Sequence, residues 1–141
     1  MDGYHLQRFI EAQKNDYSIA LQEIMNGKKR SHWMWYIFPQ IDGLGHSEVS
    51  KYYSIKNLHE AMAYIKHPVL GKRLHEISDA SLRLKTNNAT EIFGSPDDMK
   101  LRSCMTLFAS LPGAEPVFDT VLKKFFAGIK DERTLKIIHK M

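Results

Sequence analysis

"SPDDMKLRSCMTLF", residues 95–108, contains the full pattern of an amphipathic α-helix and indicates an all-α protein. Ser95 is placed to cap the helix, Pro96 suits its first position, and the two aspartates that follow complement the helix dipole. Apolar side chains then recur at the spacing of one helix face, at Leu101, Cys104, Met105 and Phe108. The Leu-Pro-Gly sequence at 111–113 predicts the end of this helix.

Similar start and stop signals recur along the rest of the chain. Asp16 and Asp131 are placed as N-caps and Gly27 as a C-cap, while Asn57 and Glu60 form a capping box. We expect helices over 4–14, 17–26, 32–38, 58–66, 69–84, 96–110, 116–127 and from 132 onward. No segment shows the sustained two-residue alternation of a strand. The sequence therefore predicts a single all-α domain, 1–141, of about seven or eight short helices.

Composition and charge exclude several classes of protein. The chain has 141 residues, 43% of them hydrophobic, and one cysteine, which excludes an internal disulfide and a cysteine-rich metal site and favours a cytoplasmic location. No apolar run approaches the ~20 residues that a membrane span needs, and the N-terminus lacks the apolar core of a secretory signal. A net charge of +4 is too small to indicate nucleic acid binding.

The segment KKRSHWMWYIFPQ, 28–40, joins three consecutive cations to two tryptophans, a histidine, a tyrosine and a phenylalanine. We call it the basic–aromatic segment. Ser31 is placed to cap a short helix over 32–38, which Pro39 ends. The free backbone N–H groups at the start of that helix, together with the three cations, would form a small anion site.

Two faces of the predicted short helix carry aromatic rings, and both cannot be deep core. One side would hold His32, Trp35 and Tyr36, and another Trp33, Ile37 and Gln40. Either one face packs into the core and the other lies under a neighbouring loop, or the rings form a ligand wall. In the second case they would stack on a base or sugar while the cations contact phosphate.

Other motifs predict structure rather than chemistry. The glycine pair in QIDGLGHS, 40–47, lacks the preceding strand and the Gly-Lys-Ser/Thr of a phosphate loop, so we expect a tight loop. Cys104 lies on an apolar stripe and is expected to be an inert core thiol. Gly71 falls inside a helix, where it costs about 1 kcal/mol relative to alanine, and close approach of two helices is one reason to accept that cost.

The histidines show no metal-site spacing, so the sequence predicts no metal and no cofactor. His32 sits among cations and rings and is the best candidate for a catalytic acid–base group. His67, directly before a proline, is expected to form a structural junction between two helices. The sequence leaves open whether the protein is an enzyme.

Three blocks, at 27–47, 67–74 and 91–108, together resemble domain-of-unknown-function family 1810. This family comprises small bacterial and fungal proteins, some labelled calpastatin, and the resemblance spans about residues 5–138. It implies a multihelical single domain and no established activity. Calpain inhibitors of the calpastatin type are long, repetitive and disordered, unlike this aromatic chain.

The polar positions that match the family pattern and that packing alone does not explain are Arg30, His32, Gln40, Ser47, Arg73, Asp98, Lys100 and Thr106. With the basic–aromatic segment, they define the candidate ligand-binding residues Lys29, Arg30, Ser31, His32, Trp33, Trp35, Gln40, Ser47, Arg73 and Lys100.

Three interpretations of these residues remain open. The first is a helical protein that binds, and processes if it is an enzyme, a small anionic, nucleotide-like ligand through the basic–aromatic segment. The second is a non-enzymatic module in which the same segment contacts an acidic protein partner, which predicts an exposed apolar patch. The third places the rings in the core and the cations in solvent. Membrane binding and nucleic acid binding are disfavoured in all three.

Overall fold

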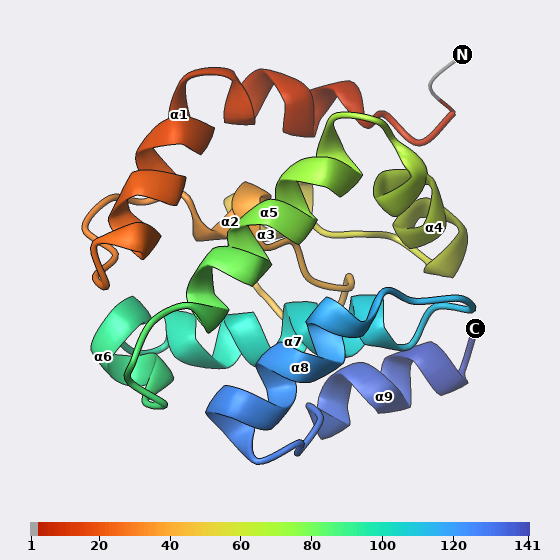
Figure 1. The fold of residues 1–141 in the computed structure, drawn as a ribbon. Helices are drawn as coiled ribbons and strands as arrows, with labels where there is room; N and C mark the ends of the chain where they lie inside the picture. The colour runs from red at the N-terminus through yellow and green to blue at the C-terminus, as the bar shows by residue number, and fades with distance from the viewer. Residues whose placement is uncertain (1–2) are drawn as a thin grey trace.

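The computed structural model describes residues 3–141, which form nine α-helices and no strand (Figure 1). The helices are α1 (Gln7–Met25), α2 (Met34–Ile37), α3 (Glu48–Tyr52), α4 (Leu58–Lys66), α5 (Leu70–Leu82), α6 (Ala89–Phe93), α7 (Asp97–Ala109), α8 (Pro116–Phe126) and α9 (Glu132–His139). The all-α prediction is therefore confirmed. An isolated parallel bridge between Ile41 and Ile55 fixes the loop after α2.

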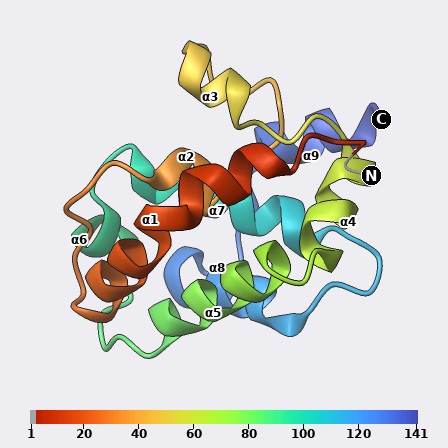
Figure 2. The ribbon, with the colours of Figure 1, turned by 90° about the horizontal axis from the view of Figure 1, so that it is seen from above.

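The predicted break at Asp16 is wrong, because α1 is one continuous helix from Gln7 to Met25, although it bends along its length (Figures 1 and 2). The Asp16 side chain does not cap a helix. Its carboxylate accepts a short hydrogen bond from the hydroxyl of Tyr36, which lies on α2. A tertiary partner has taken the acceptor that the sequence assigns to a local cap.

Two short helices, α3 and α6, were not expected from the sequence, and the start of α7 differs from the prediction. Helix α7 begins at Asp97 with Pro96 before it, and no side chain caps it, so the capping role predicted for Ser95 is wrong. Figure 2 shows α3 projecting from the rest of the helical body, and none of its residues is buried. Elements this short carry too few residues to show a helical period.

Several predicted caps are confirmed. The Asn57 side chain accepts from the backbone N–H of Glu60 at 2.9 Å, and the Asp131 side chain accepts from that of Thr134 at 3.0 Å. Gly27 follows the end of α1 with φ +83°. His67, the residue before Pro68, also forms the predicted junction between two helices: its Nδ1 accepts from the backbone N–H groups of Val69, just before α5, and Leu70, the first residue of α5, at 3.1 and 3.3 Å.

The core is formed where α5, α7 and α8 pack together, with α1 and α4 covering α5 (Figure 1). Cys104, Phe108 and Phe118 are fully buried there. The buried position of Cys104 confirms the prediction of a core cysteine, and burial raises the pKa of its thiol. The approach of α4 to α5 depends on Gly71, since a Cβ added to it would lie only 2.0 Å from the Ile65 carbonyl oxygen.

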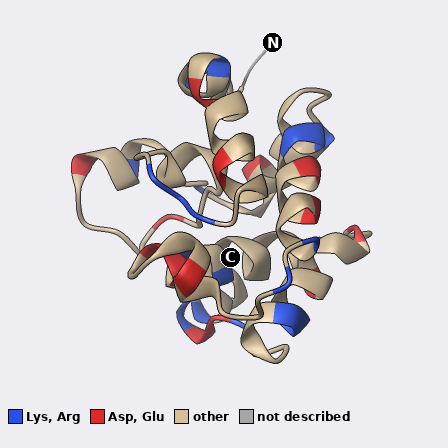
Figure 3. Ribbon diagram, turned by 60° about the vertical axis from the view of Figure 1, so that its left-hand side comes forward, with Lys and Arg blue, Asp and Glu red and all other residues tan. Residues whose placement is uncertain are grey.

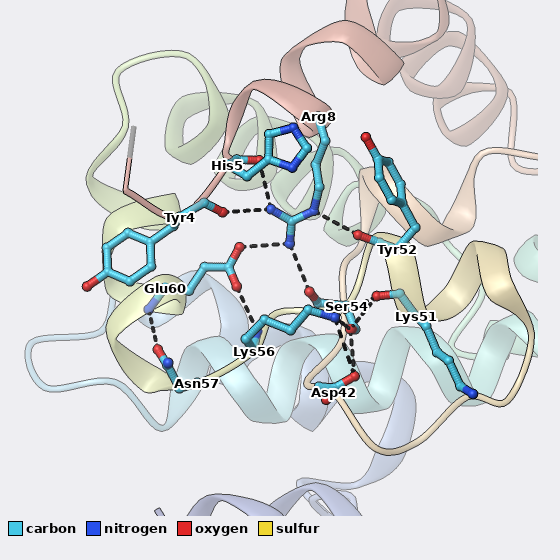
Figure 4. A network of polar contacts seen from close by, with 10 residues as sticks. All are labelled: Tyr4, His5, Arg8, Asp42, Lys51, Tyr52, Ser54, Lys56, Asn57 and Glu60. Atoms are coloured by element: carbon cyan, nitrogen blue, oxygen red, sulfur yellow. Dashed lines mark hydrogen bonds and ion pairs between the residues drawn. The ribbon is translucent and has the colours of Figure 1, made fainter. Parts of the chain in front are cut away.

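A buried arginine ties the start of α1 to α4 and to the segment after α3 (Figure 4). The Arg8 and Glu60 side chains are 4% and 1% exposed and form an ion pair at 2.7 Å. The other guanidinium hydrogens go to the carbonyl oxygens of Tyr4, His5, Tyr52 and Ser54, at 2.8–2.9 Å. All five N–H donors of the guanidinium are therefore used within the protein, and this arginine holds the fold rather than a ligand.

Candidate functional site

The basic–aromatic segment is mostly loop. Helix α2 covers only Met34–Ile37, its N-cap position is Trp33, and no side chain caps it. The predicted helix over 32–38 with Ser31 as its cap is therefore wrong. The physical reason lies in α1, because the Ser31 hydroxyl donates to the Glu23 carboxylate at 2.5 Å and is not available to the helix.

Glu23 receives four hydrogen bonds from the loop. The backbone N–H groups of Arg30 and Ser31 donate to its Oε1 at 2.8 and 3.0 Å, and the Trp33 indole N–H donates to the same atom at 2.9 Å. The Ser31 hydroxyl donates to Oε2. We call these four donors the Glu23 cage. The backbone N–H groups of this loop therefore do bind an anion, and this anion is the Glu23 carboxylate of the same chain.

The cage changes the acidity of Glu23. Partial burial raises the pKa of its carboxyl, but the hydrogen bonds from Ser31, the Arg30 backbone and Trp33 outweigh this and lower the pKa from 4.5 to about 2. The carboxylate therefore remains charged throughout the physiological range. Its charged form links α1 to the loop.

This depressed pKa predicts a stability that depends on pH. The folded pKa lies below the unfolded one, so the contribution of Glu23 is complete above about 4.5 and is lost as the pH falls toward about 2. We expect Glu23→Gln to cost about 1–3 kcal/mol at neutral pH, because a neutral amide oxygen accepts weaker hydrogen bonds than the charged carboxylate and the NH₂ group no longer accepts from the Ser31 hydroxyl. The difference from the wild-type free energy of unfolding, measured by urea denaturation, should shrink between pH 4.5 and acid. A difference independent of pH would contradict the cage.

The two tryptophans occupy different environments. Trp33 is 1% exposed and belongs to the core. Trp35 is half-buried at the surface, with the Lys100 ammonium 5.2 Å from its ring centroid. The Lys29 ammonium lies 5.1 Å from the Trp33 ring centroid. Each ring therefore carries one lysine within cation–π distance.

One carboxylate joins the two lysines. Asp97, at the start of α7, contacts the Lys29 ammonium at 2.9 Å through Oδ2 and the Lys100 ammonium at 3.2 Å through Oδ1. Lys29 is 8% exposed and also donates to the Ser31 carbonyl at 2.6 Å. This group of two cations and one anion leaves a net positive charge between the core tryptophan and the surface tryptophan.

A small cavity lies between α2 and the loop before α3. It measures about 20 Å³ and is lined by Trp35, Gln40 and the glycines of the loop, Gly43 and Gly45, among others. Such a volume accommodates about one water molecule. His32, Ser47 and Lys100 do not line it, so the predicted site residues are not brought together in one enclosed pocket.

The remaining predicted residues make structural contacts. Ser47 caps α3 by accepting from the Ser50 N–H at 3.1 Å. The Arg73 guanidinium lies 5.1 Å from the Tyr17 ring centroid and donates to Gln13. The other two polar residues that match the family pattern, Asp98 and Thr106, also make structural contacts. Asp98 accepts from the Thr90 hydroxyl at 2.6 Å, and the Thr106 hydroxyl accepts from the Asp131 N–H at 2.9 Å.

Sequence reasoning missed Glu23 and Asp97 as partners of the basic–aromatic segment. A signal for Glu23 exists: it lies in the last turn of α1, where the helix dipole disfavours an acidic side chain. An unfavourable charge at that position suggests that a tertiary contact holds it. For Asp97 the sequence indicates only a residue at the start of a helix. That role already accounts for an aspartate, so nothing in the sequence points to its ion pairs with Lys29 and Lys100.

A wider hollow of about 560 Å³ lies at the turn between α4 and α5 and contains His67, His75 and Glu115. Both histidines have structural contacts. The His67 Nδ1 caps α5, and the His75 Nδ1 lies 2.5 Å from Glu115 Oε2. This contact is too poorly aligned to be a hydrogen bond, and the buried His75 Nδ1 has no other hydrogen-bond partner within residues 3–141.

The surface has mixed charge. Figure 3 shows Lys and Arg residues interspersed with Asp and Glu on the side that it presents. Within 3–141, no three His, Cys, Asp or Glu side chains are grouped so that they could hold a metal ion. None of the helices in that range is both long and apolar enough to span a membrane.

Comparison with known proteins supports the family resemblance. The family model described as "Protein of unknown function (DUF1810)" matches residues 3–138. The crystal structure of the conserved hypothetical protein Rv1873 from Mycobacterium tuberculosis is similar with a TM-score of 0.94 and 43% sequence identity, covering 96% of this chain and 97% of that one. No curated protein matches the chain. With nearly its whole length matched, the chain belongs to the DUF1810 family of helical proteins of unknown function.

Proposed function

We propose that the protein binds a small anionic, nucleotide-like ligand on the outer side of the basic–aromatic segment, beside Trp35. The observation that carries this proposal is the group of Lys29, Asp97 and Lys100. Two ammonium groups share one carboxylate there, and one of them lies against a half-exposed indole ring. A cation over a ring at the surface suits a ligand that combines negative charge with a planar group.

Further positive charge is available on the same basic–aromatic segment. The side chains of Lys28 and Arg30 are exposed and have no hydrogen bond or ion pair within residues 3–141, and the His32 ring is likewise exposed. The adjacent cavity is too small for a base or sugar. A planar ligand group would therefore lie on the outer surface of Trp35, while its anionic group contacts the cations. A reaction at this ligand would use the His32 imidazole for proton transfer.

Thermal unfolding with nucleotides and sugar phosphates tests the proposal. A ligand at a hundred times its Kd stabilises the folded state by about 2.7 kcal/mol, so the melting temperature should rise with at least one compound. Arg30→Ala should fold normally, because only its backbone N–H has a partner, and should lose most of that rise. His32→Ala should behave in the same way.

Arg83→Ala is a matched control, because Arg83 is also exposed but pairs with Asp79 on α5. It should keep the full response to the ligand. If no compound raises the melting temperature of the wild-type protein, or if Arg83→Ala loses the response as fully as Arg30→Ala, the proposal fails.

The alternative, a protein interaction module, receives less support. It predicts a contiguous apolar patch beside the basic–aromatic segment. The exposed large apolar side chains of residues 3–141 instead come from many elements, among them α1, α3, α7 and the segments before α1, α5 and α9, and none of them belongs to the basic–aromatic segment.

A further inference from the structure

The Glu23 cage has the composition of an anion receptor. Its four donors are two consecutive backbone N–H groups, a hydroxyl and an indole N–H, and all reach one carboxylate at 2.5–3.0 Å. Neutral donors aimed at one point are how proteins commonly bind carboxylate and phosphate oxygens. The cage is not a helix terminus, because α2 begins only at Met34.

The surroundings of the cage suit an incoming anion. The exposed, unpartnered side chains of Lys28 and Arg30 belong to the same loop, and the Lys29 ammonium donates to the Ser31 carbonyl within it. The Glu23 side chain is only partly buried, so rotation about its own bonds can carry its carboxylate into solvent without displacing α1. The resident anion can therefore leave while its donors stay in place.

We infer that the loop at 28–33 is a receptor for a ligand oxyanion, a carboxylate or a phosphate, and that Glu23 is the resident anion which this ligand group replaces. The inference rests on the proposed function in one respect: a ligand anion must reach this segment. The inference adds to the proposed function the atoms that bind the ligand anion, and it states that this anion competes with the Glu23 carboxylate for them. The ligand binds only when the rest of it, on Trp35 and the lysines, offsets the displacement of Glu23.

The competition with Glu23 also predicts which anions should not bind the wild-type protein. Glu23 is tethered to the loop and has the advantage of an intramolecular partner, whereas free acetate must be supplied from solution. Simple anions should therefore not compete in the wild-type protein. Removing the Glu23 carboxylate should make the cage available to them.

The experiment is chemical rescue of Glu23→Ala by sodium acetate and, separately, sodium phosphate, with sodium chloride at matched ionic strength as reference. Because acetate binds the folded state, we expect a saturable rise of about 2–4 °C in the melting temperature of the variant and no such rise in the wild-type protein. Rescue by acetate alone assigns a carboxylate ligand, and rescue by phosphate assigns a phosphate ligand.

Glu23→Gln is the matched control, because its amide fills the space of the carboxylate and should leave no room for acetate. The indole N–H signals in a ¹⁵N NMR spectrum supply a second measurement. The chain has two tryptophans, so acetate should shift the Trp33 signal of Glu23→Ala and leave that of Trp35 unchanged. A variant too unstable to fold in chloride should refold in acetate.

Equal responses of Glu23→Ala to acetate, phosphate and chloride, or an unmoved Trp33 signal, would overturn the receptor. This result is distinct from failure of the proposed function. The receptor is tested by simple anions on a variant, and the proposed function by organic ligands on the wild-type protein. Rescue of Glu23→Ala together with an unresponsive wild-type protein would therefore uphold the anion-binding cage and reject the proposed ligand class.

Discussion

Arg8→Met should reduce the free energy of unfolding by about 3–5 kcal/mol, because it leaves a buried carboxylate without its counter-ion. Glu60 is 1% exposed, and its remaining hydrogen bond comes from the Lys56 backbone N–H at 2.7 Å. The substitution also removes the donors to four backbone carbonyls, two just before α1, one at the last residue of α3 and one just after it. Urea denaturation followed by circular dichroism measures the loss.

Two comparisons separate burial from charge. Arg83→Met removes an arginine whose ion pair with Asp79 is largely exposed, and it should change stability by less than about 1 kcal/mol. Arg8→Lys keeps the charge but has three donors for five acceptor contacts, so it should recover only part of the loss. An Arg8→Met protein as stable as Arg83→Met would show that the buried network contributes little.

Gly71→Ala should destabilise the protein by about 3 kcal/mol, at the upper end of overpacking effects, although the same change inside an ordinary helix is favourable. The added Cβ would lie 2.0 Å from the Ile65 carbonyl oxygen and 2.8 Å from its carbon. Both are backbone atoms, so relief requires α4 to move away from α5. Thermal and urea unfolding should both show the loss.

Gly3→Ala provides the control, because a Cβ at Gly3 would meet no atom within 4 Å. That substitution should leave stability within about 0.5 kcal/mol of the wild type. If Gly71→Ala instead stabilised the protein, as helix propensity alone predicts, the close approach of α4 and α5 would be refuted.

Helices with local signals were predictable, and those without them were not. The N-caps at Asn57 and Asp131 act as the sequence indicates, because the cap and the N–H group that it binds lie three residues apart. The second half of the predicted capping box is absent, since the Glu60 carboxylate accepts from the Lys56 N–H and from Arg8. At Asp16 and Ser95 equally suitable residues do not cap. The Asp16 carboxylate binds Tyr36, twenty residues away, and such a competitor is invisible to a local pattern.

The candidate site shows the same division. The basic–aromatic segment is conspicuous in sequence, and its two tryptophans do each lie within cation–π distance of a lysine. The anion that its donors bind, however, is the carboxylate of Glu23 in the same chain. Several matched polar positions, such as Thr106 and Ser47, have capping or hydrogen-bonding roles that the sequence did not assign. A polar residue that packing does not explain can bind either a ligand or a distant group of the same chain. Only the tertiary structure distinguishes these two roles.

The sequence by itself determined the all-α class, most helix positions and the buried cysteine, because these depend on periodicity and on caps within a few residues. The family was recognisable from the sequence blocks at 27–47, 67–74 and 91–108, which resemble it. The tertiary structure alone decided which charges are paired. Arg8 meets Glu60 across 52 positions of sequence, and Glu23 meets the segment that follows its own helix only because the chain turns back there. Buried polar groups must find partners wherever the fold places them, and that placement is a property of the whole chain.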